Sequence, residues 1–263
     1  MVKDELDILP YSIQNLINQG VDGLLVADNM STDGTWEWLQ GRRLTSPVPL
    51  ILQRDEEVAY YQSEKMSALA AQAFSLGAGW IVPFDADEFW YCSAPGGPKT
   101  LAEAVELAGP TVRALKAPLY NYFPLSSDGS SEPNPFLRIT HRDSVPAPLP
   151  KVIVRRGSDL VIEQGNHGVV GVSAVPSPVR VAHFPWRYAE QFERKVRNGY
   201  RAYRATNLPD SVGAHWRDYG RILEGAGPAA IWDVFNTWFL DPPERELVHH
   251  PVPYARLGES PLD

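Results

Sequence analysis

In the first third of the chain, stretches with the apolar spacing of a helix alternate with short apolar runs typical of strands. We expect two amphipathic helices, each ending at a glycine, and one short helix between them, and each of the three helices is followed by a strand. The helices carry Leu9, Ile13, Leu16 and Ile17, then Trp36 and Leu39, then Met66, Leu69, Ala70, Ala73 and Phe74; the strands are expected at 21–27, 50–53 and 80–84. This alternation predicts a parallel, doubly wound sheet with ligands at the carboxyl ends of its strands.

A central strand should open such a sheet, yet the chain begins almost at once with the polar run that starts at Lys3. Either Met1 and Val2 are the end of that strand, or a few residues precede them. We expect the second.

Beyond residue 100 the alternation gives way to separate strands and then to helices. Thr100 and Glu103 form a capping box for a helix that ends at Ala108. Strands are expected at 112–123, 151–154, 160–163 and 179–183; a loop rich in Pro and Ser at 124–150; helical stripes at 188–200 and 231–238; and an irregular tail from Asp241. The chain should therefore divide into residues 1–187 and a helical extension, 188–263, packed on them.

Composition and charge limit the kinds of binding partner and the cellular location that we expect. The net charge of −8 disfavours a phosphate backbone, so we expect no nucleic acid partner. No apolar run approaches the ~20 residues that span a bilayer. The single cysteine, Cys92, excludes an internal disulfide and fits a reducing cytoplasm, the expected location. The chain has eight Trp and eleven Tyr, which is many for its length. These side chains either pack in the core and between subunits, which would fit a homo-oligomer, or stack on sugars and nucleosides.

Two carboxylates, Asp85 and Asp87, follow the apolar run 80–84. Side chains at i and i+2 can reach one hard cation from a tight turn. Mg²⁺ and Mn²⁺ favour such sites, since one or two carboxylates and phosphate oxygens complete their coordination. An ordinary solvated acidic turn is the alternative, because Asp-x-Asp is common.

A second polar stretch begins at Asp28, which ends another apolar run. Ser31, Thr32 and Asp33 favour side-chain-to-backbone turns before a helix. A carboxylate at that strand end can accept a hydrogen bond from a base NH or a ribose hydroxyl. The stretch is equally compatible with a plain β–α connection.

Together and in this order, these stretches resemble the glycosyltransferases with the GT-A fold, in particular the family 2 enzymes. The matching pieces are Val-Lys-Asp-Glu at 2–5, Asp-Asn-Met-Ser-Thr-Asp-Gly-Thr at 28–35 and Asp-Ala-Asp-Glu-Phe at 85–89, followed by 165–167, 183–187 and 192–199. The resemblance implies an α/β fold of the GT-A type, a mixed sheet flanked by helices with a helical C-terminal section. It also implies metal-dependent transfer of a sugar from a nucleoside diphosphate sugar, with a UDP-sugar expected, to a small-molecule or glycan hydroxyl.

The resemblance also suggests individual roles. Asp28 would hold the base or ribose, Asp85 the ribose or the metal, and Asp87 the metal itself. His183 would be a third ligand or a diphosphate contact, unless it is an ordinary half-buried histidine. The cation, Mn²⁺ or Mg²⁺, would neutralise the leaving diphosphate. Basic residues that could reach the phosphates, or merely form a solvated face, are Lys65, Arg187, Lys195 and Arg197.

Family 2 enzymes generally invert the anomeric centre and need a base for the acceptor hydroxyl. Their usual base is the Asp of a Glu-Asp pair after the central sheet, and this sequence has no such pair there. Glu163 and His167 occupy about the right stretch and are the candidates. His167 would otherwise only hydrogen-bond the backbone of its Gly-rich turn.

Other function classes compete with this hypothesis. A nucleotidyltransferase would carry a Gly-rich basic loop after the first strand, and none is present. A two-metal phosphohydrolase needs more ligands than six scattered His offer. A non-catalytic sugar-nucleotide-binding module remains open, and assays of sugar-nucleotide hydrolysis with and without Mn²⁺ would distinguish it from an enzyme.

Overall fold

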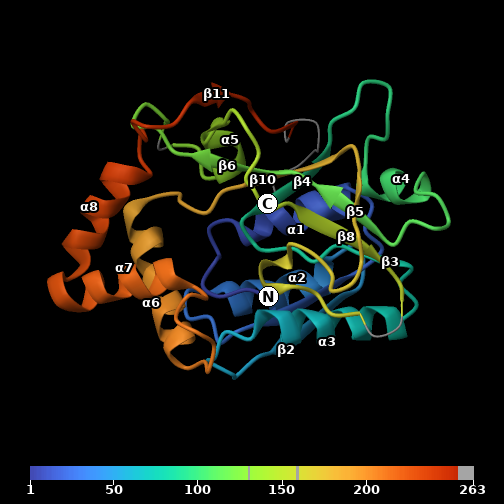
Figure 1. Cartoon of the computed structure of the whole chain (residues 1–263), viewed down its shortest axis with the longest axis horizontal. Coiled ribbons are helices and arrows are strands. Elements are labelled where there is room, and N and C mark those ends of the chain that lie inside the picture. The colour runs from blue at the N-terminus through green and yellow to red at the C-terminus, as the bar shows by residue number, and fades with distance from the viewer. Residues whose placement is uncertain (130, 158–159, 254–263) are drawn as a thin grey trace.

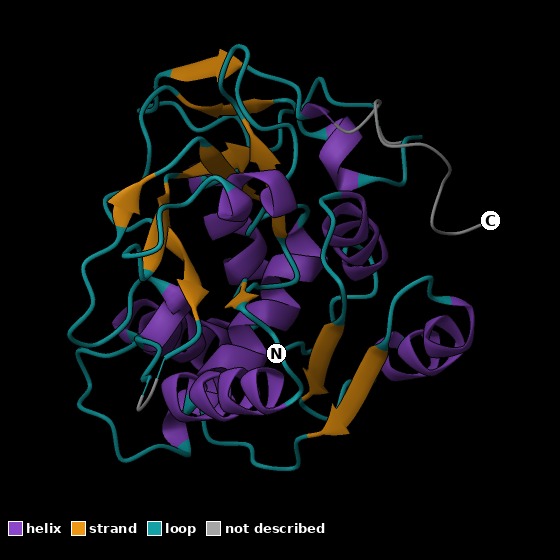
Figure 2. Cartoon of the chain, turned by 90° about the vertical axis from the view of Figure 1, so that its right-hand side faces the viewer, coloured by secondary structure: helices purple, strands orange, loops and turns teal. Residues whose placement is uncertain are grey.

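The computed structural model describes residues 1–129, 131–157 and 160–253. Helices and strands occur throughout the molecule (Figure 2), and three helices of the C-terminal section gather on one side of it (Figure 1). Parallel and antiparallel strand pairs both occur, and helices flank them. The predicted mixed α/β fold with a helical C-terminal section is confirmed.

The first half contains the predicted β/α alternation. β1 and β2 pair in parallel, and Val2 forms a parallel bridge to Asp28, at the position expected for a central strand. α1 stops before Gly20, whose φ of +83° favours glycine and where a Cβ would approach that of Ala102 to 2.8 Å. The elements are α1 (Leu9–Asn18), β1 (Leu24–Asp28), α2 (Thr35–Thr45), β2 (Leu50–Arg54) and α3 (Gln62–Ser75).

The remaining described strands form two further sheets. One has the order β11-β7-β6-β10-β4 and the other β3-β8-β5-β9, and both mix parallel and antiparallel pairs. The parallel pairing expected from the alternation is therefore confined to β1, β2 and the bridge from Val2, and Trp80 and Ile81 instead pair antiparallel with β8 in a mixed sheet. The strands are β3 (Trp80–Ile81), β4 (Glu88–Cys92), β5 (Ala114–Ala117), β6 (Leu119–Phe123), β7 (His141–Asp143), β8 (Lys151–Arg155), β9 (Val175–Pro176), β10 (Val179–His183) and β11 (Leu247–His249).

Several predicted boundaries need correction. The strand expected at 112–123 is two strands, because Pro118 separates β5 from β6 and has no N–H for a ladder. The run 80–84 pairs only at Trp80 and Ile81. The run 160–163 forms no regular strand and contributes a single bridge, from Ile162 to Val169.

The predicted loop 124–150 and the predicted irregular tail also contain regular structure. Asn134 caps a short helix, α5 (Pro135–Arg138), by accepting a hydrogen bond from the Phe136 N–H at 3.0 Å. β7 lies between β6 and β11, so the tail strand is held by a partner that sequence spacing alone does not reveal. Residues 254–263 of the predicted tail lie outside the described residues.

The helical section has its own apolar core, which is joined to the sheet. Phe192, Ile231 and Phe235 are buried there together with Phe123 of β6. Trp186 stacks between Phe123 and Phe239, with ring centroids 5.2 and 4.3 Å away. The helices of this section are α6 (Ala189–Arg204), α7 (Ala214–Ala226) and α8 (Pro228–Trp238). The remaining α-helix of the described residues, α4 (Leu101–Glu106), lies earlier in the chain. Within the described part of the chain, none of the helices has the length and apolar character needed to span a membrane.

Candidate functional site

Strand register brings the predicted acidic motif and His183 together. Asp85 and Asp87 lie in the connection from β3 to β4, and β4 pairs with β10 so that Glu88 lies opposite His183. The Phe184 N–H donates to the Asp87 carbonyl at 2.9 Å, which ties the two strand ends together. On the other side of β10, parallel pairing with β6 places Asn121 opposite His183.

These contacts fix the orientation of the His183 ring. Its Nδ1 lies 2.9 Å from Oδ1 of Asn121, while its Nε2 lies 3.6 Å from Oδ1 of Asp87. The amide oxygen accepts a hydrogen bond from the Nδ1–H, which turns Nε2 towards the Asp87 carboxylate, where a neutral ring presents a lone pair and a charged ring a proton. Asn121 carried no motif, and only the register of the finished sheet reveals it.

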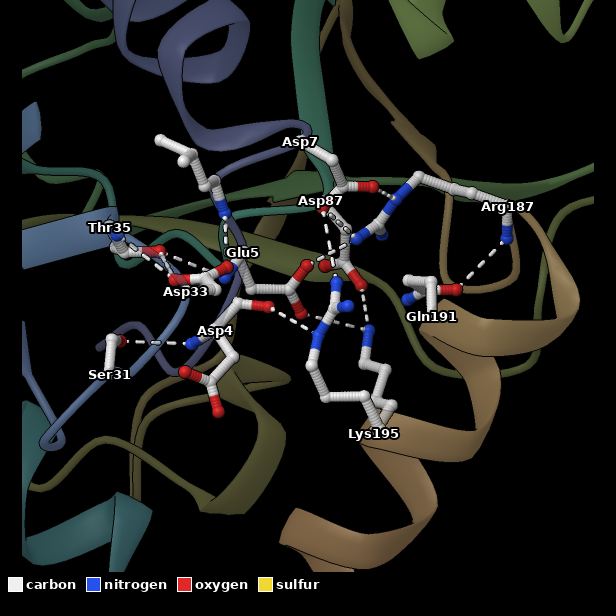
Figure 3. A network of polar contacts seen from close by, with 12 residues as sticks. Asp4, Glu5, Asp7, Ser31, Asp33, Thr35, Asp87, Arg187, Gln191 and Lys195 are labelled. Atoms are coloured by element: carbon white, nitrogen blue, oxygen red, sulfur yellow. Dashed lines mark hydrogen bonds and ion pairs between the residues drawn. The ribbon is translucent and has the colours of Figure 1, made fainter. Parts of the chain in front are cut away.

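Asp87 is buried within a network of charges (Figure 3). The Lys195 ammonium is ion-paired with Oδ2 of Asp87 and lies 3.5 Å from a Glu5 carboxylate oxygen. Burial alone would raise the pKa of Asp87, but the Lys195 ammonium and then His183 outweigh it and hold that pKa well below its usual range. Asp87 is therefore ionised at neutral pH.

Asp85 belongs to a separate network on the other side of the turn. Its Oδ2 pairs with the Lys151 ammonium at 2.7 Å, and its Oδ1 accepts hydrogen bonds from Gln62 and Asn166, both at 3.1 Å. Burial would raise the pKa of Asp85, and Lys151 outweighs burial and lowers it. Lys151 also pairs with Glu88 at 2.7 Å, although burial still raises the pKa of Glu88 to about 7. Sequence reasoning missed Lys151, whose sole signal was a charge at the start of an apolar strand.

Asp28 is completely buried at the end of β1. Its Oδ2 accepts the Ser31 N–H at 3.1 Å and is ion-paired with Arg54, whose guanidinium lies 4.6 Å from the Trp36 ring centroid. Its Oδ1 makes no hydrogen bond to any residue in the described ranges. A buried carboxylate oxygen without a donor is costly, so a ligand N–H or O–H there would be favourable.

Two of the residues expected to contact phosphates have protein partners in this structure. Lys65 donates to the Asp55 carboxylate at 2.6 Å and to the Glu57 carbonyl at 2.9 Å. The Arg187 side chain is fully buried, where it contacts Asp7 through two nitrogens and is also bonded to Glu5. In this state both residues hold loops around the site in place.

The two candidate bases differ in environment. His167 is half-buried, and its Nδ1 lies 2.9 Å from the Pro150 carbonyl, so Nδ1 donates and Nε2 keeps its lone pair. Burial, followed by the nearby Lys151 ammonium, lowers the pKa of His167 and favours the neutral ring. Glu163 is exposed and lies against Gly168, where a Cβ would approach its carboxylate to 2.5 Å.

A cavity of about 620 Å³ opens beside this site, between the N-terminal residues, the stretches that follow β1 and β2, and helix α6. Lys195 and Glu5 line it, and both belong to the Asp87 network. Its described lining carries four cations and three carboxylates, in contrast to the excess of acids over the whole chain. These residues are Lys3, Arg194, Lys195 and Arg201, and Asp4, Glu5 and Glu56.

The residues present fit a divalent cation in part. No cluster of three or more His, Cys, Asp or Glu suited to a metal occurs among the residues described. Asp87 Oδ1 and His183 Nε2, 3.6 Å apart, nevertheless offer the mixed oxygen and imidazole donors that Mn²⁺ accepts. Such a site is complete when substrate phosphates supply further oxygens. Asp85 is less available, since Lys151, Gln62 and Asn166 occupy its oxygens.

Comparison with known proteins gives limited information. No protein-family model matches the sequence, and none of the curated proteins matches it either. The crystal structure of S. aureus TarS 1–349 in complex with UDP is similar over 86% of this chain and 70% of that chain, with 12% sequence identity and a TM-score of 0.41. A likeness of this size assigns no function, so the function of this chain has to be inferred from its own site.

Proposed function

We propose that the protein is a glycosyltransferase that moves a sugar from a nucleoside diphosphate sugar, with UDP as the expected carrier, to an acceptor hydroxyl. The observation that carries the proposal is the ionised Asp87, which lies beside His183 and is linked through Lys195 to a cavity of about 620 Å³. A donor diphosphate needs such a combination of cations and a metal-binding carboxylate.

Residues that line the cavity, or that belong to the polar networks beside it, suit different parts of the donor. The Asp28 oxygen that lacks a protein donor is suited to a base N–H or a ribose hydroxyl. Lys195 and Arg194 line the cavity on α6 and are suited to phosphate oxygens. Asp87 and His183 would hold Mn²⁺ or Mg²⁺, which when bound supplies Lewis-acid stabilisation of the leaving diphosphate.

Transfer requires a proton acceptor on the other side of the reacting sugar carbon. We propose that His167 Nε2 removes the proton of the acceptor hydroxyl, with Glu163 as the alternative base. The hydroxyl oxygen then forms a bond to the anomeric carbon, and the carbon–oxygen bond to the diphosphate breaks with its electron pair. The low pKa and the fixed Nδ1 donor of His167 keep the Nε2 lone pair available near neutral pH.

A panel of nucleoside diphosphate sugars, assayed for hydrolysis and for transfer with Mn²⁺ and with EDTA, tests the proposal. We expect at least one donor to release its nucleoside diphosphate in a Mn²⁺-dependent reaction. Asp87→Asn should lose this activity, whereas a matched change at exposed Asp233, Asp233→Asn, should retain it. Binding of UDP without turnover of any donor would instead favour a non-catalytic nucleotide-binding module.

A further inference from the structure

The helical section contributes two aromatic side chains to the described lining of the cavity. Tyr203 near the end of α6 and Trp216 in α7 both line it, and Tyr60 lines it from the stretch that follows β2. The rings of Tyr60 and Tyr203 are 4.9 Å apart at 49°, and the Tyr60 N–H donates to the Ala202 carbonyl at 3.3 Å. The stretch after β2 is therefore attached to α6 beside the cavity.

A glycine inside α6 allows Trp216 to take this position. A Cβ at Gly199 would lie 3.0 to 3.2 Å from three atoms of the Trp216 ring. Glycine within a helix is destabilising relative to alanine, and here it permits close packing of the ring against the helix backbone. Gly199 and Trp216 both line the cavity, so this packing sets the shape of its wall.

Helix α6 runs along the cavity and lines it from Gln191 to Tyr203. Lys195 contacts Asp87, and Tyr203 is eight residues further along, about 12 Å at 1.5 Å per residue. The cavity is also lined by Asn29, Met30 and Thr32, from the stretch that follows Asp28; Asp28 itself is completely buried and is not among the described lining residues. Arg194 and Lys195, which contacts Asp87, therefore lie towards one end of this stretch of α6, whereas Tyr203 and Tyr60, with Arg201 close by in the sequence, lie towards the other. An extended nucleoside diphosphate has the same order, with phosphates at one end and an aromatic base at the other.

We propose that Trp216, which packs on Gly199 of α6, forms the surface against which the nucleobase of the donor packs, with buried Tyr203 in the same wall, so that helices α6 and α7 complete the donor site. This inference rests on the proposed function. Base–aromatic contact tolerates different bases because every base has a π face, and Asp28 on the sheet side then provides hydrogen bonding.

Uridine and UDP binding, measured by calorimetry on the full chain, test the inference. Trp216→Leu should weaken both ligands by a similar factor of about tenfold or more, because the lost contact is to the base that they share. Trp216→Phe should recover part of the affinity. Trp238→Leu is the matched control, since Trp238 is 52% exposed on α8 and is not among the described lining residues.

A second measurement avoids reliance on a stable Trp216→Leu variant. In protein labelled with 5-fluorotryptophan, uridine should shift the ¹⁹F resonance of Trp216, assigned with Trp216→Phe, and should leave that of Trp238 in place. An unmoved Trp216 signal at saturating uridine would overturn the inference.

The outcomes also distinguish the inference from the proposed function. Equal UDP affinity in the wild type and Trp216→Leu would overturn the aromatic surface and leave the transferase proposal standing. If Trp216→Leu raised only the KM for the acceptor and left uridine affinity unchanged, the rings would belong to the acceptor site, and the inference would also be overturned. If the wild type did not bind UDP in the presence of Mn²⁺, both the aromatic surface and the proposed function would be overturned.

Discussion

Nε2 of His183 lies 3.6 Å from Oδ1 of Asp87, although the two residues are far apart in the sequence. The antiparallel register of β4 and β10 produces this approach, since it pairs His183 with Glu88, the residue after Asp87. The lysine on α6, Lys195, approaches the other oxygen of the same carboxylate. The site therefore depends on a sheet and a helix that meet only in the folded protein.

Asp87→Asn should abolish metal-dependent UDP binding and leave the fold intact. The amide keeps the shape of the side chain but removes the negative charge that a divalent cation and Lys195 share. Calorimetry with UDP in Mn²⁺ and in EDTA measures the effect, and circular dichroism checks the fold. Unchanged Mn²⁺-dependent affinity would place the metal elsewhere.

Asn121→Ala should lower Mn²⁺ affinity by about 10- to 100-fold, although Asn121 is not expected to touch the metal. Its oxygen fixes Nδ1 of His183 as the donor, and without it the ring is free to rotate or change tautomer. Electron paramagnetic resonance of free Mn²⁺, titrated with protein and UDP, measures the affinity. Asn121→Asp retains an acceptor and should recover most of it; equal loss in both variants would contradict a positioning role.

Asp28→Asn should weaken uridine binding even in EDTA, because the contact expected of Asp28 is with the base or ribose. The free Oδ1 is the acceptor available to the ligand, and an amide in its place presents one acceptor and one donor. A loss of about tenfold or more would be in line with an unmatched buried polar group. Loss seen only when Mn²⁺ is present would assign Asp28 to the metal site.

His167→Gln should reduce transfer by about 10² to 10⁴-fold and leave UDP affinity unchanged, as expected for a general base. In the wild type, the pKa of His167 lies below its ordinary value of 6.5, since burial and Lys151 disfavour the charged ring. Activity should therefore stay constant at neutral pH and fall only when the pH drops below 6.5 through that lowered pKa.

The matched test is Glu163→Gln, which should keep near-normal turnover because Glu163 is exposed. If Glu163→Gln is inactive and His167→Gln is not, the base is Glu163.

Local patterns in the sequence predicted the elements that depend on local chemistry. α1, α3 and the capping box at Thr100 follow from helical spacing and from side-chain capping, and each was found close to its expected range. β11 was missed, since its single described partner, β7, lies about a hundred residues earlier, and spacing carries no information on such a pairing.

At the site, too, local sequence patterns revealed some residues, whereas others are brought in only by long-range contacts. Asp28, Asp85 and Asp87 were recognisable because a carboxylate follows an apolar run. Their partners were not, because Lys151 and Arg54 reach them from other strands. Arg187 illustrates the ambiguity of a basic residue: its charge suggested a phosphate contact, and its location in the folded chain surrounds it with carboxylates.

Arg187→Met should therefore lower stability, while its direct effect on the nucleotide should be small. The Arg187 side chain is fully buried and satisfies Asp7 and Glu5, so its loss leaves Asp7 without its main counter-charge and leaves Glu5 with Lys195 as its neighbouring cation. Removing one member of a buried ion pair costs about 3–5 kcal/mol, and the partial exposure of Asp7 favours the lower end. Methionine keeps much of the apolar volume, which limits the effect to the lost charge and hydrogen bonds.

Urea unfolding of the wild type and Arg187→Met measures the difference, with Arg221→Met as the control for an exposed arginine, 62% of whose side chain is in solvent. The control should change stability by less than about 0.5 kcal/mol. Without urea, and at a temperature at which both variants are folded, UDP affinity should change far less in Arg187→Met than in Asp87→Asn. Normal stability together with weakened UDP binding would mean that Arg187 leaves its carboxylates and contacts the phosphates when the donor is bound.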